Sequence, residues 1–131
     1  MTTETDSKLR VLVVDDDPLV RTALTRTLRH RGLETIEVSD GASALEALGR
    51  ERIAVVLSDI NMAGMNGIEL LRAIRVVDLD VPVILLTGAP SIETASQAVR
   101  LGALEYLTKP TEPDQLVASI RRAYTLGALA R

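Results

Sequence analysis

Short runs of apolar residues alternate with longer stretches in which apolar positions recur every three or four residues, and this alternation repeats five times. The short runs are typical of buried strands, and the longer spacing is typical of helices with one apolar face. Five such pairs predict βα units around a parallel sheet. We expect the strands at residues 11–14, 33–38, 53–57, 83–86 and 103–107.

The composition of two of these runs predicts their places in the sheet. Glu34 and Glu37 interrupt the second run, which suits an edge strand, whereas the third run is continuously apolar and suits a central strand. The predicted fold is α/β: a doubly wound, flavodoxin-like (βα)5 domain with five parallel strands in the order 2-1-3-4-5. We divide the chain into a flexible tail (1–8), the folded domain (9–126) and a helix end or linker start (127–131).

Residues at the predicted helix ends support this division. Asp17 suits an N-cap and Pro18 the first helical position, Gly32 closes that helix, and Ser91 opens the fourth one. The apolar faces are expected to carry Leu19, Val20, Ala23, Leu24, Thr27 and Leu28 in the first helix, Leu45 and Leu48 in the second, Ile68, Leu71 and Ile74 in the third, Ile92, Ala95, Val99 and Gly102 in the fourth, and Leu116, Ile120 and Ala123 in the last.

Composition and charge exclude several classes of protein. The chain has 131 residues, 47% of them hydrophobic but none of them Phe or Trp, which predicts one domain with an aliphatic core. A net charge of −3 without a basic block disfavours nucleic-acid binding. Cysteine is absent and His30 is the one histidine, so disulfides, thiolate metal sites and histidine zinc sites are excluded.

No apolar run approaches the roughly 20 residues that span a bilayer. Residues 1–7 are polar and acidic and do not resemble a signal peptide. We therefore expect a cytoplasmic domain without membrane contact.

Reactive side chains follow four of the five predicted strands. Asp15 and Asp16 follow the first strand, Asp59 the third, Thr87 the fourth and Lys109 the fifth. Ligands of open α/β sheets bind beyond the carboxyl ends of the strands, where the strand order reverses. Strands one and three are neighbours in the predicted order, so three carboxylates converge there. Their mutual repulsion requires a cation or raised pKa values.

This arrangement predicts magnesium-dependent phosphoryl chemistry. Asp59 and either Asp15 or Asp16 could ligate Mg²⁺, with a backbone carbonyl near Asn61 as a third protein oxygen. Asp59 would then be a nucleophile that forms an acyl phosphate. The Thr87 hydroxyl and the Lys109 ammonium would bind the other phosphoryl oxygens.

Each of these residues alone has a simpler interpretation. The acids at 15–17 could mark a helix start, and Asp59 could be a turn residue. Thr87 could be a strand-end hydroxyl, and Lys109 a solvated lysine. Lys109 is, however, one of two lysines against thirteen arginines. Because four of the five predicted strands deliver a reactive residue to one edge of the sheet, we favour a functional site.

Four stretches that include these residues resemble the receiver domain of two-component response regulators. They are Val-Leu-Val-Val-Asp-Asp-Asp-Pro at 11–18, Ser-Asp-Ile-Asn-Met-Ala-Gly-Met-Asn-Gly at 58–67, Leu-Thr-Gly at 86–88 and Tyr-Leu-Thr-Lys-Pro at 106–110. The likeness extends from about residue 9 to 126. It implies that Asp15 and Asp16 bind Mg²⁺ and that Asp59 accepts a phosphoryl group from a sensor histidine kinase or phosphotransfer protein. Thr87 would be the switch hydroxyl, and Lys109 the lysine that pairs with the phosphate.

The resemblance also implies how such a domain signals. Tyr106 matches the family's switch aromatic, whose ring changes rotamer as Thr87 moves; the alternative is a ring packed at the sheet edge. The switching surface would be the fourth helix, fifth strand and last helix, through which a homodimer could also form. The family is a phosphorelay signalling module rather than an enzyme, with only self-phosphotransfer and slow autodephosphorylation. We expect one part of a longer regulator with an output domain, and the stretch 87–109 also resembles receivers joined to cyclic-di-GMP phosphodiesterase domains.

Three positions and two rival functions qualify this interpretation. Ala63 stands where the family usually has proline, and Asn61 and Ala89 occupy positions that tune dephosphorylation in the family. One rival is a phosphorylation-independent pseudo-receiver scaffold, which usually lacks the acid pair or the lysine. The other is a small phosphohydrolase, which usually has a second acid where this chain has Asn61.

Overall fold

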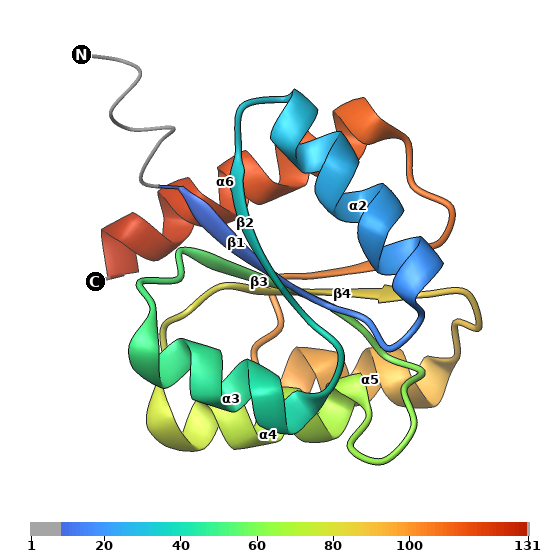
Figure 1. Ribbon diagram of the computed structural model, residues 1–131. Helices are drawn as coiled ribbons and strands as arrows, with labels where there is room; N and C mark the ends of the chain where they lie inside the picture. Colours follow the sequence, from blue (N-terminus) through green and yellow to red (C-terminus); the bar gives the residue numbers. More distant parts are fainter. Residues whose placement is uncertain (1–8, 131) are drawn as a thin grey trace.

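The computed structural model describes residues 9–130 and contains five parallel strands in one sheet (Figure 1). The strands are β1 (Arg10–Val14), β2 (Glu34–Val38), β3 (Val55–Asp59), β4 (Val83–Thr87) and β5 (Glu105–Thr108). Their order is β2-β1-β3-β4-β5, and all four neighbouring pairs are parallel. The predicted fold class, the strand order and the edge position of the second strand are confirmed.

Five helices cover the two faces of this sheet. They are α2 (Pro18–His30), α3 (Gly41–Arg50), α4 (Gly67–Val77), α5 (Ile92–Arg100) and α6 (Pro113–Ala130). Helices α2 and α6 pack on one face, and α3, α4 and α5 pack on the other (Figure 1). Residues 127–130, expected to be a helix end or a linker, belong to α6, whereas the predicted tail at 1–8 lies outside the described residues.

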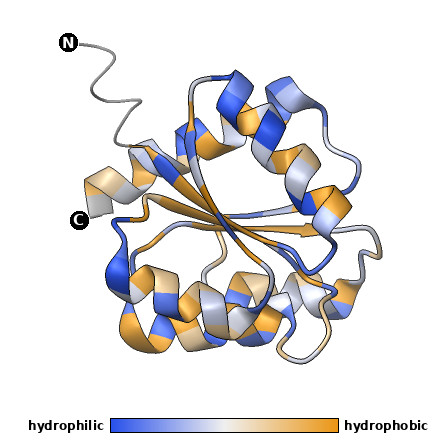
Figure 2. Ribbon diagram, in the orientation of Figure 1, coloured by the Kyte–Doolittle hydropathy of each residue, from blue (hydrophilic) through white to orange (hydrophobic). Residues whose placement is uncertain are grey.

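Two aliphatic cores lie between the sheet and its helices. The three central strands are almost wholly buried, and in Figure 2 most of their length has the hydrophobic colour. Alternate side chains of each strand enter opposite cores, so that Leu12 and Val56 face α3 and α4 while Val13 and Leu57 face α2 and α6. The edge strand β2 is only half-buried. In the described part of the chain, no helix is long and apolar enough to cross a membrane.

The predicted helix caps are present. The Asp17 carboxylate accepts hydrogen bonds from the backbone N–H groups of Leu19 and Val20, and Pro18 is the first residue of α2. The Ser91 hydroxyl accepts a hydrogen bond from the Thr94 N–H at the start of α5. These caps fix where each helix begins, immediately after the loops at the carboxyl ends of β1 and β4.

The apolar face expected on α5 is not the face that packs against the core. Ile92 and Val99 are 90% and 76% exposed, and the residue of α5 that enters the core is Ala98. In α2, Leu19 and Ala23 are likewise exposed. Few residues of either helix are buried, namely Thr25 and Leu28 in α2 and Ala98 in α5, so which residues are buried depends on the contact with the sheet and not on the size of the side chain. The predicted inward residues of α4 and α6 are all buried.

Candidate functional site

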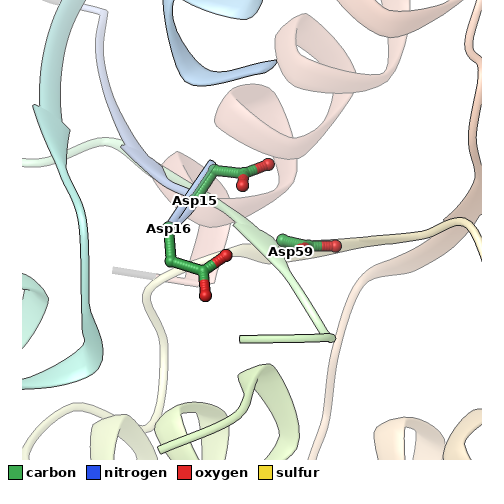
Figure 3. A group of neighbouring side chains, drawn as sticks. All are labelled: Asp15, Asp16 and Asp59. Atoms are coloured by element: carbon green, nitrogen blue, oxygen red, sulfur yellow. The ribbon is translucent and has the colours of Figure 1, made fainter. Parts of the chain in front are cut away.

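Three carboxylates meet at the carboxyl ends of β1 and β3. These strands are neighbours, with Val14 paired to Ser58, so Asp15 and Asp16 after β1 lie beside Asp59 at the end of β3 (Figure 3). One carboxylate oxygen from each of the three lies within 4.8 Å of the others, close enough for all three to ligate one metal ion. Asp15 is 1% exposed and Asp59 8%, whereas Asp16 is exposed to solvent. The predicted convergence of the three acids is therefore present.

Lys109 links two of these acids. Its Nζ lies 3.1 Å from Asp59 Oδ1 and 3.2 Å from Asp15 Oδ2. The lysine follows β5, and its backbone N–H donates to the Thr87 carbonyl at 2.8 Å, which ties the loop after β5 to the end of β4. The solvated-lysine interpretation is thus excluded, because the ammonium group is paired at the centre of the cluster.

Burial and charge act in opposite directions on Asp59. Burial raises the pKa of its carboxyl group and the nearby Asp15 carboxylate adds to this, while Lys109 and the Asn61 N–H oppose it; the net direction is upward. Burial alone would lower the pKa of Lys109, but its bonds to Asp59 and Asp15 outweigh burial and raise it. Three ionised carboxylates and one ammonium leave two negative charges (−3 + 1 = −2), which a divalent cation would balance.

The acid pair is held by backbone donors. Asp15 Oδ1 accepts the Asp17 N–H at 2.9 Å, and Asp16 Oδ2 accepts the Ala63 N–H at 2.9 Å. Proline has no N–H, so the second bond depends on the residue that departs from the usual pattern of the family. At this position, alanine connects the loop after β3 directly to the acid pair.

Thr87 is fully buried at the end of β4. Its hydroxyl oxygen accepts hydrogen bonds from Asn61 Nδ2 at 3.2 Å and from the Ala89 N–H at 3.0 Å. The Asn61 backbone N–H also acts on Asp59, because it opposes the rise in the pKa of that carboxyl group. Asn61 therefore joins Thr87 to Asp59, a role of its side chain that the sequence did not predict.

Tyr106 lies on β5, half-buried against the core of the α3, α4 and α5 face. Its hydroxyl accepts the Ser91 N–H at 3.1 Å and shares a hydrogen bond with Thr94 Oγ1 at 2.6 Å. The ring is thus packed at the sheet edge and is also bonded to the start of α5. The sequence did not predict that Ser91 and Thr94 bind the Tyr106 hydroxyl, although it did predict Ser91 at the start of α5.

Comparison with known proteins identifies the class to which this fold and site belong. The family model for the response regulator receiver domain matches residues 11–121. The C4-dicarboxylate transport transcriptional regulatory protein DctD of Pseudomonas aeruginosa is 43% identical over 124 residues, which cover 95% of this chain and 27% of DctD. The DNA-binding transcriptional regulator NtrC of Escherichia coli K12 is 42% identical over 113 residues, which cover 86% of this chain and 24% of NtrC. The chain belongs to the response regulator receiver domain family.

Solved structures agree with this assignment. A CheY-like response regulator receiver domain protein from Methanospirillum hungatei superimposes with a TM-score of 0.89 at 26% identity, covering 94% of this chain and 98% of that one. The signal receiver domain of an HD domain-containing protein from Pseudomonas fluorescens gives a TM-score of 0.86 at 26% identity, with coverages of 92% and 97%. The chain spans whole receiver domains but only about a quarter of DctD and NtrC.

Proposed function

We propose that Asp59 accepts a phosphoryl group from a sensor histidine kinase or a phosphotransfer protein, and that this modification switches the domain's surface. The observation that carries the proposal is the contact of one ammonium group, Lys109 Nζ, with both Asp59 and Asp15 inside a cluster of three carboxylates. A site that only stabilised the fold would not need to bring three acids so close together, because their repulsion opposes folding.

The proposed transfer uses groups of this chain in distinct roles. An Asp59 carboxylate oxygen forms a bond to phosphorus while the phosphorus–nitrogen bond to the donor histidine breaks, and the imidazole keeps the bonding electrons. The Lys109 ammonium group would stabilise the negative charge that develops on the phosphoryl oxygens during the transfer. Asp15, Asp16, Asp59 and the Asn61 backbone carbonyl would hold Mg²⁺, which when bound neutralises negative charge on the transferring group.

Phosphorylation of Asp59 would change a surface of the domain at a distance from Asp59. A phosphoryl oxygen would take the Thr87 hydroxyl away from its bonds to Asn61 and Ala89. Movement of Thr87 would alter the space beside Tyr106 and so the surface of α5, β5 and α6, where a partner or a second copy of the chain could bind. The domain would act in the cytoplasm as one part of a longer regulator with an output domain, without nucleic-acid or membrane contacts of its own.

Phosphorylation with a small donor tests the proposal directly. Acetyl phosphate with Mg²⁺ should add one phosphoryl group to the wild type, detected as a single mass increase, and none to Asp59→Asn. Beryllofluoride should change the environment of Tyr106, followed by ¹⁹F NMR of 3-fluorotyrosine with Tyr124→Phe to assign the signals. An unmodified wild type would support the pseudo-receiver scaffold, and continuous release of phosphate at many equivalents would support the phosphohydrolase.

A further inference from the structure

Arg21 closes the first turn of α2, and its guanidinium group turns back toward the acid pair. Arg21 Nη1 donates to the Asp15 backbone carbonyl at 2.7 Å, and Nε donates to Glu37 Oε1 on β2 at 3.3 Å. The side chain is 19% exposed, so this arginine is largely covered. It therefore connects β2 to the main chain of a residue in the proposed metal site.

The orientation of the Asp15 carbonyl affects the geometry of the acid pair. Strand β1 ends at Val14, and the Asp15 N–H still donates to the Val38 carbonyl of β2 at 3.2 Å. The carbonyl on the other side of Asp15 belongs to the peptide group that joins it to Asp16. The orientation of this peptide plane determines where both carboxylates point, and a charged donor at 2.7 Å fixes it more firmly than a neutral donor would.

We infer that Arg21 is a positioning residue of the magnesium site, holding the Asp15–Asp16 peptide so that both carboxylates face Asp59, and that Glu37 holds Arg21 in place. The inference rests on the proposed function only in taking the acid cluster to bind Mg²⁺. Outer residues that orient metal ligands typically change metal affinity by about 10–100-fold when replaced. We expect the lower end of this range, because Arg21 holds a backbone carbonyl and not a ligand atom.

Whether replacement of Arg21 weakens or tightens Mg²⁺ binding distinguishes a positioning role from a purely electrostatic one. Arg21 carries a positive charge close to a cation site, and a charge acting only through space would repel Mg²⁺. Replacement by glutamine would then tighten Mg²⁺ binding. If Arg21 positions the ligands, the same replacement weakens binding despite the loss of repulsion.

Arg29 provides a matched control. It lies on the same helix, its Nη2 is 4.0 Å from Glu37 Oε2, and its Nε donates to Thr35 Oγ1 at 2.7 Å. Arg29→Gln thus makes the same change of charge next to the same glutamate, on a side chain whose hydrogen bond goes to Thr35 instead of Asp15. Arg21→Lys keeps the charge but replaces the planar two-armed donor by a point charge that cannot bind Asp15 and Glu37 in the same way.

Calorimetric titration of the metal-free proteins with MgCl₂ tests the inference, at a temperature where each variant is folded in EDTA by circular dichroism. We expect Arg21→Gln to bind Mg²⁺ about tenfold more weakly than the wild type. Arg21→Lys should lie between the two, and Arg29→Gln should match the wild type. Glu37→Asp, which keeps the negative charge but withdraws the carboxylate from Arg21, should weaken Mg²⁺ binding a few-fold and serves if the Arg21 variants do not fold.

Two results would overturn the inference. In the first, Arg21→Gln binds Mg²⁺ as tightly as Arg29→Gln or more tightly; in the second, all folded variants of Arg21 and Glu37 match the wild type. Either result would leave the proposed function standing if the wild type binds Mg²⁺ and takes up phosphate. A wild type that does not bind Mg²⁺ at millimolar concentration would instead contradict the proposed metal site itself.

Discussion

At the scale of single residues, Asp59 shows how a reactive group costs stability. Its pKa is raised, first by burial and then by the Asp15 carboxylate, although Lys109 lies 3.1 Å away. A carboxyl group with a raised pKa binds its proton more tightly in the folded state than in the unfolded state. Its contribution to stability is therefore present below the ordinary aspartate pKa and is lost as the pH rises through the raised value.

Asp59→Asn should consequently stabilise the metal-free protein at pH 7. Asparagine removes the buried charge but keeps the size of the side chain, so we expect the free energy of unfolding to rise. The gain should shrink as the pH falls below the range in which aspartates ionise, because the wild-type carboxyl group is then also neutral. Urea denaturation in EDTA at a series of pH values from 3 to 7 (about the range in which carboxyl groups titrate) measures the difference.

Asp16→Asn is the control for this experiment. Asp16 belongs to the same cluster but is exposed, so neutralising it should give a smaller gain than neutralising Asp59. A metal-free Asp59→Asn protein that is less stable than the wild type at pH 7 would show that the ion pair with Lys109 outweighs burial.

At the scale of elements, the start of α4 determines how β3 presents Asp59. Gly67 is the first residue of α4, is buried, and its N–H donates to the Ile60 carbonyl at 2.9 Å. A Cβ atom added to Gly67 would meet the Asp59 carbonyl oxygen and would lie 2.8 Å from the Ile60 Cα atom. Both neighbours are backbone atoms, so the helix and the end of β3 cannot both keep their places if a larger residue is present.

Gly67→Ala should therefore lower the free energy of unfolding by about 1–3 kcal/mol, the usual cost of an overpacked contact. It should also slow phosphate uptake by Asp59, because the Asp59 backbone has to move. Gly49→Ala on α3 is the matched control: a Cβ there has no neighbour within 4 Å, and alanine in a helix should add about 0.5–1 kcal/mol. Urea denaturation of both variants measures the changes in stability, and phosphorylation by acetyl phosphate measures the rate of uptake. Equal stability of the two variants would contradict the close contact between position 67 and the backbone of Asp59 and Ile60.

The elements differ in how much of them the sequence could predict. In α4 the apolar stripe Ile68, Leu71 and Ile74 coincides with the buried face, because the apolar side of this helix packs against the core. In α5 the largest apolar residues, Ile92 and Val99, are exposed while Ala98 is buried. Periodicity shows that a helix has an apolar side, but only tertiary contacts decide whether that side meets the sheet.

At the scale of the whole molecule, the strand order was predictable because the composition of the second and third apolar runs marks an edge strand and a central strand. The acid cluster then follows from what stands at the ends of the strands. Each reactive residue stands directly after an apolar run, and a parallel sheet brings those ends together. The contacts that support the site are of another kind. Arg21 to Asp15, Asn61 to Thr87 and Tyr106 to Thr94 depend on side-chain orientation between separate elements, which no periodic pattern in the sequence encodes.

The acid cluster finally predicts a dependence of the whole fold on Mg²⁺. The unfolded chain cannot keep Asp15, Asp16 and Asp59 together, so Mg²⁺ should bind the folded state and stabilise it. Mg²⁺ at ten times its dissociation constant should then add about 1.4 kcal/mol to the free energy of unfolding. Urea denaturation with MgCl₂, compared with NaCl at equal ionic strength, separates binding from screening of the repelling carboxylates. Asp59→Asn should lose most of the gain specific to Mg²⁺, and an equal gain in NaCl would show that the cluster responds only to ionic strength.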